Sequence, residues 1–284
     1  MRFRRRKRPF GLPAGAPIAN EPLPTARRRG IYLLPNLFTM AALFSGFFAI
    51  VQAMSNRFEL AAIAIFAAMV LDGMDGRVAR LTNTQSAFGE QFDSLSDMTS
   101  FGVAPALVMY EWILKDLGRW GWAAAFVYCA GAALRLARFN ANLGVVDKRF
   151  FQGLPSPASA ALIAGFVWLA IDNKFPIREA WLPWVAFGLT VYAGFTMVSS
   201  APFYSGKSFQ VGRSVPFWVL VALIGVIFVV SSDPPIALFT LFCGYALSGY
   251  VYWAWRWFRH EPNPAKPVPA KPVPAESAKA TKPT

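Results

Sequence analysis

The sequence predicts an all-α, polytopic integral membrane protein with about eight transmembrane helices. Of the 284 residues, 55% are hydrophobic, and Phe and Trp occur 26 and 10 times. Apolar stretches of roughly 18 residues recur along the chain, which is long enough for a helix to cross the hydrocarbon core of a bilayer. A soluble domain of this composition would expose apolar patches large enough to cause aggregation.

The predicted spans follow one another through short polar connections. They cover residues 36–54, 58–78, 88–113, 120–137, 157–171, 181–198, 216–231 and 234–255. An even number of spans places both termini on the same side of the membrane. We therefore divide the chain into a basic N-terminal segment, 1–30, a transmembrane domain, 31–258, and a tail, 259–284, whose Pro/Ala/Lys composition predicts disorder.

The basic residues predict the orientation, because short cytoplasmic loops collect Lys and Arg. With the N-terminus inside, all but five of the 28 Lys and Arg residues fall in cytoplasmic segments. Both termini and the acidic site described next are then cytoplasmic. The net charge of +13 is concentrated in the two ends, which favours contact with anionic membrane lipids and argues against nucleic acid as a partner. The five outer basic residues are Arg57, Lys115, Arg119, Lys174 and Arg178.

Four aspartates form a fixed frame inside two apolar spans. The frame reads DGMDGRVAR, eight further residues, then GEQFDSLSD. Helical spacing places the first two aspartates on one face of the second span and the last two on one face of the third. Carboxylates within a membrane are costly and repel one another unless cations lie between them. The sequence therefore predicts one carboxylate cage, formed by Asp72, Asp75, Asp93 and Asp97.

The available side chains restrict the chemistry of this cage. The one histidine, His260, lies beyond the last span, which excludes a Ser-His-Asp triad and a histidine-rich zinc site. An all-oxygen site prefers hard cations such as Mg²⁺, Mn²⁺ or Ca²⁺, and a pair of them clamps a diphosphate during attack at phosphorus. Arg80 is suited to neutralise a leaving phosphate, and glycines at 73, 76 and 89 leave room for a ligand or a neighbouring backbone. These features favour phosphoryl-group transfer.

Two other interpretations of the acids stay open on the residues alone. The first is a set of salt bridges with Arg77 and Arg80, although two arginines cannot neutralise the four aspartates and Glu90. The second is a cation-coupled transporter. Transporter sites usually lie near the bilayer midplane in repeated, broken helices, whereas these acids lie at helix ends and the frame has no second copy.

The aspartate frame resembles, at every fixed position, the signature of the CDP-alcohol phosphatidyltransferase family. The resemblance implies an integral membrane enzyme in which an alcohol displaces CMP from a CDP-linked lipid, with a pair of Mg²⁺ or Mn²⁺ ions as cofactors. It implies that Asp72, Asp75 and Asp93 bind metal, and that Asp97 is both a ligand of the second metal and the general base. The residues that it implies to contact the CDP moiety are Gly76, Ala79, Arg80 and Gly89.

Three flanking segments are similar to the membrane-embedded phosphatidylserine synthases of bacteria within that family. They are LPNLFTMAALFSGFFAI from Leu34, SLSDMTSFGVAPAL from Ser94 and RFNANLGVVDKRFFQGLPSPASA from Arg138. This similarity implies CDP-diacylglycerol and L-serine as substrates, a homodimer, and the bacterial inner membrane as location. Phosphatidylglycerophosphate synthases typically carry a proline and a lysine where this chain has Ser94 and Met98. Glycerol 3-phosphate, choline and inositol stay open as alternative acceptors.

Further polar residues are candidates for substrate contacts. Arg135 and Arg138, at the inner end of the fourth span, and Lys148 in the following loop offer a clamp for a serine carboxylate or a lipid phosphate. Asn36 and Thr39, one helical turn apart, either contact the CDP-lipid through its cytidine or ribose or cap the first span. The loop FFQGLPSP either caps the site or merely connects two spans.

Overall fold

The structure of the protein is a computed structural model. It describes residues 26–82, 84–141, 150–174, 179–204 and 217–259. Helices dominate these ranges, which also contain one pair of short strands. In chain order the elements are α1 (Ala26–Met54), α2 (Phe58–Thr82), α3 (Ala87–Asp97), the π-helix η1 (Met98–Val103), α4 (Ala104–Trp112), the 3-10 helix η2 (Leu114–Leu117), α5 (Arg119–Ala141), β1 (Phe150–Gln152), α6 (Ser156–Leu169), the π-helix η3 (Ala170–Lys174), α7 (Leu182–Val198), β2 (Pro202–Tyr204), α8 (Phe217–Ser232) and α9 (Pro234–Phe258).

Each predicted span coincides with a helix or a run of helices. The third predicted span is the continuous run α3–η1–α4, in which a π-helix directly follows Asp97. Such π-helical segments are frequent at functional sites. The predicted first span, 36–54, agrees with the apolar part of α1, Leu34–Met54, but the helix itself begins earlier, at Ala26, and contains Pro35 in its interior. A proline inside a helix removes one backbone hydrogen bond, which neighbouring helices and side chains compensate in a membrane bundle.

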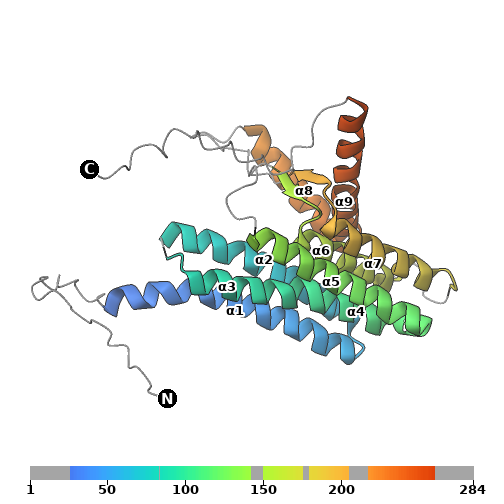
Figure 1. Ribbon diagram of the computed structural model, residues 1–284, viewed down its shortest axis with the longest axis horizontal. Coiled ribbons are helices and arrows are strands. Elements are labelled where there is room, and N and C mark those ends of the chain that lie inside the picture. Colours follow the sequence, from blue (N-terminus) through green and yellow to red (C-terminus); the bar gives the residue numbers. More distant parts are fainter. Residues whose placement is uncertain (1–25, 83, 142–149, 175–178, 205–216, 260–284) are drawn as a thin grey trace, which may run out of the picture.

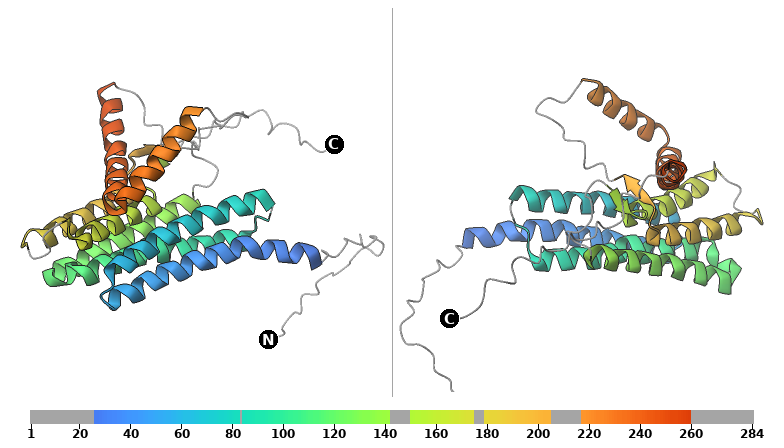
Figure 2. Two further views of the ribbon diagram at one scale, coloured as in Figure 1. Left: turned by 180° about the vertical axis from the view of Figure 1, so that it is seen from behind. Right: turned by 45° about the horizontal axis from the view of Figure 1, so that its top comes forward.

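The helices α1 to α7 run alongside one another, whereas α8 and α9 project away from this bundle (Figures 1 and 2). α9 packs against α6 and β2, and its buried residues are only Pro235, Ala246 and Gly249. It crosses the other helices steeply (Figure 1). The arrangement of these last two helices therefore does not confirm the predicted seventh and eighth spans, and the number of spans stays a prediction.

Two described helices are long and apolar enough to cross a membrane by length and composition. They are the part of α1 from Leu34 to Met54, with a mean hydropathy of 1.8, and α9, with a mean hydropathy of 1.4. Shorter apolar helices cover 156–172 and 182–198. Large apolar side chains also face outward on the remaining helices, for example Phe126 on α5, which is 64% exposed. These outward surfaces suit contact with lipid.

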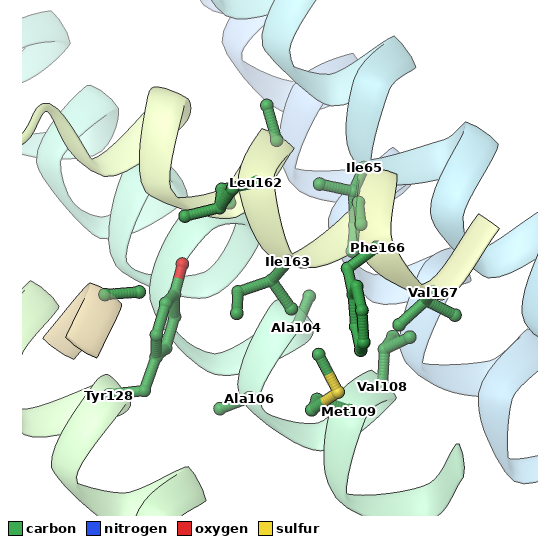
Figure 3. Close-up of a cluster of buried hydrophobic side chains, with 14 of the residues drawn as sticks. Ile65, Ala104, Ala106, Val108, Met109, Tyr128, Leu162, Ile163, Phe166 and Val167 are labelled. Carbon is green, nitrogen blue, oxygen red and sulfur yellow. The ribbon is translucent and has the colours of Figure 1, made fainter. Parts of the chain in front are cut away.

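The core of the bundle is formed around α6. Its side chains Leu162, Ile163, Phe166 and Val167 lie between Ile65 of α2, Val108 and Met109 of α4, and Tyr128 of α5 (Figure 3). Every residue of α6 from Ala158 to Val167 is buried. Because small residues such as Ala160, Ala161, Ala164 and Gly165 alternate with the large ones, neighbouring helices approach closely on several sides.

Glycines permit the closest helix crossings. A Cβ atom on Gly46 of α1 would lie 2.7 Å from the Cα atom of Ser100 in η1, and one on Gly131 of α5 would lie 2.5 Å from the carbonyl oxygen of Gly194 in α7. Both distances are too short for a side chain, so these helices pack backbone to backbone. The first crossing holds α1 against η1, which continues directly from α3. It therefore keeps α1 close to α3, and the site described below lies beside these two helices.

Polar connections gather at the end of the bundle where α2 ends and α3 begins. There, β1 pairs antiparallel with β2, with Phe151 opposite Phe203, and ties the connection after α5 to the connection after α7. The opposite end carries the α1–α2 and α4–α5 connections, with Arg57, Lys115 and Arg119. Arg80 and Arg138 lie in the last turns of α2 and α5, at the first of these ends, and the orientation in the membrane stays a prediction.

Candidate active site

A pocket of about 210 Å³ opens between α1, α2 and the start of α3. Two of the frame aspartates, Asp75 and Asp93, line it. The six residues predicted to contact the CDP moiety all line the same pocket, although their role stays a prediction: Asn36, Thr39, Gly76, Ala79, Arg80 and Gly89.

Three carboxylates converge at this pocket from two helices. Asp72 and Asp75 of α2 and Asp93 of α3 each offer an oxygen, and these oxygens lie within 4.8 Å of one another. At this separation two ionised carboxylates repel each other by roughly 3.5 kcal/mol at an effective dielectric constant near 20. Three of them in one place therefore require a cation or a proton between them.

Asp97 lies beside this cluster and not within it. Its carboxylate faces that of Asp72, which in turn lies against Asp93. On the other side of Asp97 lies Arg135 of α5, close enough for its charge to act on the acid. Asp97 therefore joins the cluster on α2 and α3 to a positively charged wall on α5.

Salt bridges do not account for the four acids. Among the described residues, no Lys or Arg nitrogen lies within salt-bridge distance of Asp72, Asp75, Asp93 or Asp97. Arg77 and Arg80, the partners considered from the sequence, are both exposed. The geometry thus removes the simplest structural explanation of the frame.

Two orphaned oxygens test whether the residues fit a divalent cation. Oδ1 of Asp93 and Oδ1 of Asp97 are buried and have no hydrogen-bond partner in the described part of the chain. Buried acceptors without a hydrogen-bond donor are costly. A hard divalent cation would satisfy them, because such cations prefer carboxylate oxygens as ligands. The donor set of this site, all oxygen and all acidic, therefore fits a divalent cation.

Thr39 and Asn36 hold different positions on α1. The Thr39 hydroxyl donates to Oδ2 of Asp75 at 2.8 Å, while Oδ1 of Asn36 lies against Gly89. Neither residue caps α1, since the helix begins more than two turns earlier, and that alternative was wrong.

Open space adjoins the first two glycines of the frame. A Cβ atom on Gly73 or Gly76 would meet nothing within 4 Å, and Gly76 lines the pocket. The interpretation that these glycines admit a neighbouring backbone is therefore wrong for the described residues, and room for a ligand remains at Gly76. At Gly89, in contrast, a Cβ atom would lie 3.2 Å from the Ser86 hydroxyl.

Arg135 approaches the acids from α5 and is only 9% exposed. Its Nη1 donates to the hydroxyl of Ser156 at 2.8 Å, while its Nε is buried and has no partner among the described residues. Ser156 is the first residue of α6 and directly follows the loop FFQGLP, and no described residue of this loop lines the pocket. The unused donor of Arg135 makes this wall of the site suitable for an anionic group.

Arg138 was predicted to share that role, which stays a prediction, and the structure shows other partners for its guanidinium. Its guanidinium donates to four backbone carbonyl oxygens, those of Val198 at 2.8 Å, Gln152 at 2.9 Å, Ser199 at 3.2 Å and Met197 at 3.3 Å. These bonds satisfy the carbonyls at the end of α7 and bind that end to β1. Arg138 is therefore a structural clamp. Lys148, the third candidate, lies outside the described residues.

Sequence reasoning missed several polar residues of the pocket. Ser86 caps α3 by accepting a hydrogen bond from the Gly89 amide at 3.0 Å, and the hydroxyls of Thr82 and Thr84 lie 2.7 Å apart. Thr84, Gln85, Ser86 and Glu90 line the pocket. The signal for Ser86 was present, since a serine three residues before Gly89 matches the N-cap preference. No local sequence pattern predicts that Ser156 accepts a hydrogen bond from Arg135.

The fold and the site together define a class of protein: a helical bundle with apolar outward surfaces and, at one end, a pocket beside three clustered carboxylates. Comparison with known proteins narrows that class. Residues 32–192 match the model of the CDP-alcohol phosphatidyltransferase family. The chain belongs to this family, whose members are embedded in membranes and generally use a divalent metal.

Individual relatives come from bacteria, archaea and yeast. A Helicobacter pylori protein named CDP-diacylglycerol–serine O-phosphatidyltransferase is 38% identical over 224 residues, which are 78% of this chain and 92% of the relative. A protein of the same name from Methanocaldococcus jannaschii is 36% identical over 183 residues, which are 64% of this chain and 79% of the relative. The Saccharomyces cerevisiae protein of that name is 36% identical over 161 residues, 49% of this chain and 57% of the relative.

Proposed function

We propose that the protein transfers the phosphatidyl group from CDP-diacylglycerol to L-serine and releases CMP. The observation that carries this proposal is the convergence of Asp72, Asp75 and Asp93 at a pocket lined by the family signature. The names of the relatives support the choice of serine. The transporter alternative lacks support, since the family is one of transferases.

The proposed cofactors are two Mg²⁺ or Mn²⁺ ions, held by the four aspartates of the frame. Bound there, they would neutralise the diphosphate and make its phosphorus more electrophilic. Arg80, exposed at the rim of the pocket, is placed to balance the charge that accumulates on the departing CMP.

The proposed step is a displacement at the phosphorus that bears the diacylglycerol. Asp97 accepts the proton of the serine hydroxyl, and the serine oxygen attacks that phosphorus. The bond between this phosphorus and the oxygen that bridges to CMP breaks, and CMP leaves with the bonding electrons. Asp97 then returns its proton to solvent.

The wall formed by Arg135 and Ser156 supports an acceptor with a single negative charge. The buried Nε of Arg135 is an unused donor beside Asp97, which suits the carboxylate of serine. Arg138 keeps its positive charge, but its Nη1 and Nη2 donate to backbone carbonyls. Glycerol 3-phosphate, with two negative charges, would call for a denser set of cations than serine does.

The acceptor can be tested with purified protein, CDP-diacylglycerol and single alcohols. We expect cation-dependent release of CMP with L-serine, and little release with glycerol 3-phosphate, choline or inositol. If CMP were released preferentially with one of these three alcohols, the protein would still be a phosphatidyltransferase, but that alcohol and not serine would be its acceptor.

Substitution of Arg135 by Lys should raise the KM for serine by about 10-fold or more, because the flexible ammonium group cannot reproduce the planar fork of the guanidinium. The KM for CDP-diacylglycerol should change little. Initial rates at varied serine and varied lipid measure both constants. Arg77→Lys, an exposed change on the neighbouring α2, is the control. An equal rise of both KM values in Arg135→Lys would contradict a specific contact with the acceptor.

We further propose that the protein is a homodimer of the bacterial inner membrane, with 31–258 as its transmembrane domain, 1–30 as a basic N-terminal segment and 259–284 as a Pro/Ala/Lys-rich tail. Both termini and the active site would face the cytoplasm. The uneven distribution of Lys and Arg between the two ends of the bundle supports this orientation. The mass of the detergent-solubilised protein tests the dimer.

Cysteine labelling tests the orientation. In a background that lacks Cys129 and Cys243, a membrane-impermeant maleimide added to intact cells should modify Ser55→Cys and leave Gln85→Cys unmodified. Both positions are exposed, and they lie at opposite ends of α2. Modification of Gln85→Cys in both intact and permeabilised cells would place the acidic pocket on the outer face and contradict a cytoplasmic active site.

A further inference from the structure

Thr39 lies where three helices meet, and both of its polar groups are engaged there. Its hydroxyl donates to Oδ2 of Asp75 on α2 at 2.8 Å, and its backbone carbonyl accepts a hydrogen bond from the hydroxyl of Ser96 on α3 at 3.2 Å. Ser96, Thr39 and Asp75 are only 2%, 4% and 6% exposed. At this depth little water competes for the hydrogen bonds, so the three side chains constrain one another.

We propose that Thr39 is a positioning residue for the metal site, which orients Asp75 and sets the spacing between the carboxylates of α2 and α3. This inference rests on the proposed function, because it assumes that the carboxylate cluster holds a divalent cation. It gives Thr39 a different role from the contact with cytidine or ribose that the sequence suggested.

The hydrogen-bond chemistry determines the direction of the bond to Asp75. An ionised carboxylate only accepts hydrogen bonds, so Thr39 is the donor of its bond with Asp75 whenever this acid is ionised. The Pro35 carbonyl oxygen, at 3.2 Å, is the longer alternative for the same proton. One oxygen of Asp75 is therefore held by Thr39, and the other remains for a cation.

The bond from Ser96 extends this control to the second helix of the cluster. Ser96 directly precedes Asp97 and follows Asp93 on α3, and it is bonded to the residue that holds Asp75. α1 thus becomes a common support for both halves of the cage. Cations such as Mg²⁺ demand oxygen ligands within a narrow range of distance, so an error of about 0.5 Å in the spacing of α2 and α3 would weaken binding.

The test compares two changes at Thr39 with a matched control. Thr39→Val removes the hydroxyl and keeps the shape, whereas Thr39→Ser keeps the hydroxyl. Thr190→Val is the control, because Thr190 on α7 is equally buried but its hydroxyl donates to the Ala186 carbonyl of its own helix. Mn²⁺ binding is measured on the purified full-length protein without substrate, from the electron paramagnetic resonance signal of free Mn²⁺.

Thr39→Val should weaken Mn²⁺ binding by about 10- to 100-fold, as is typical when an outer partner of a metal ligand is lost. Thr39→Ser and Thr190→Val should bind Mn²⁺ like the wild type. Wild-type affinity in Thr39→Val would overturn the proposal, and if the KM for CDP-diacylglycerol rose at the same time, Thr39 would instead be a substrate contact.

Two further outcomes are decisive. Should Thr39→Val fail to fold, Ser96→Ala removes the other bond of the junction and should also weaken Mn²⁺ binding, while unchanged binding would overturn the proposal. If the wild type itself bound no Mn²⁺ yet transferred the phosphatidyl group, this inference would fall with the proposed cofactor while the proposed transfer remained. If the wild type neither bound Mn²⁺ nor transferred the phosphatidyl group, the proposed function would fail as well.

Discussion

Replacement of Asp72, Asp75 or Asp93 by Asn is expected to lower the rate of CMP release by about 10³-fold or more, equivalent to roughly 4 kcal/mol of transition-state stabilisation. The reason is that each of these carboxylates contributes an oxygen to the same small volume. An amide oxygen carries no formal charge and so binds a divalent cation far less strongly. Initial rates in detergent at saturating Mg²⁺ or Mn²⁺ measure the loss.

The same changes should not destabilise the metal-free protein. Each Asn variant removes one charge from a cluster in which ionised carboxylates repel one another, so its thermal stability without metal should match or exceed that of the wild type. Asp116→Asn, an exposed acid at the opposite end of the bundle, controls for the loss of an acid as such. Full activity in any one of the three variants at saturating cation would remove that residue from the cage.

Asp97→Asn is expected to slow the chemical step by about 10² to 10⁴-fold while most of the affinity for metal and CDP-diacylglycerol is kept. Asp97 lies beside the three clustered carboxylates and not among them. Asp72, Asp75 and Asp93 can therefore still hold a cation in this variant. Single-turnover rates measure the chemical step. Equilibrium binding of Mn²⁺ and of CDP-diacylglycerol measures how much affinity the variant keeps for each.

The outcome of that experiment separates two roles of Asp97. A variant that loses Mn²⁺ and lipid-nucleotide binding as severely as Asp72→Asn would show that Asp97 is chiefly a metal ligand. In that case the proton of the serine hydroxyl must leave by another route. Asp97→Glu offers a second comparison, because it keeps the carboxylate and shifts it by one methylene.

The sequence predicted the helices and the acidic cluster well because both depend on local pattern. Apolar runs interrupted by short polar connections mark each helix, and the spacing of the four aspartates places them on two helix faces regardless of the rest of the fold. The residues around the pocket were found through the family signature. Polarity alone would not have separated Gly76 and Ala79 from other small residues of α2.

The sequence did not predict contacts between residues far apart in the chain. Arg138 donates to carbonyls at the end of α7, and no local pattern reveals these partners. The role of Thr39 depends in the same way on Asp75 and Ser96. The extension of α1 before its apolar part was not predicted, because proline usually marks the beginning of a helix, whereas Pro35 lies in the helix interior beside the pocket.

The central claim is that the phosphatidyl group of CDP-diacylglycerol moves to serine at a cation-dependent carboxylate site. The most direct measurement uses CDP-diacylglycerol labelled with ³²P at the phosphorus that bears the diacylglycerol, together with serine and Mn²⁺. We predict that the label appears in phosphatidylserine and not in CMP, and that EDTA abolishes the transfer. Label in phosphatidic acid, or no labelled product with serine in the presence of Mn²⁺, would contradict it.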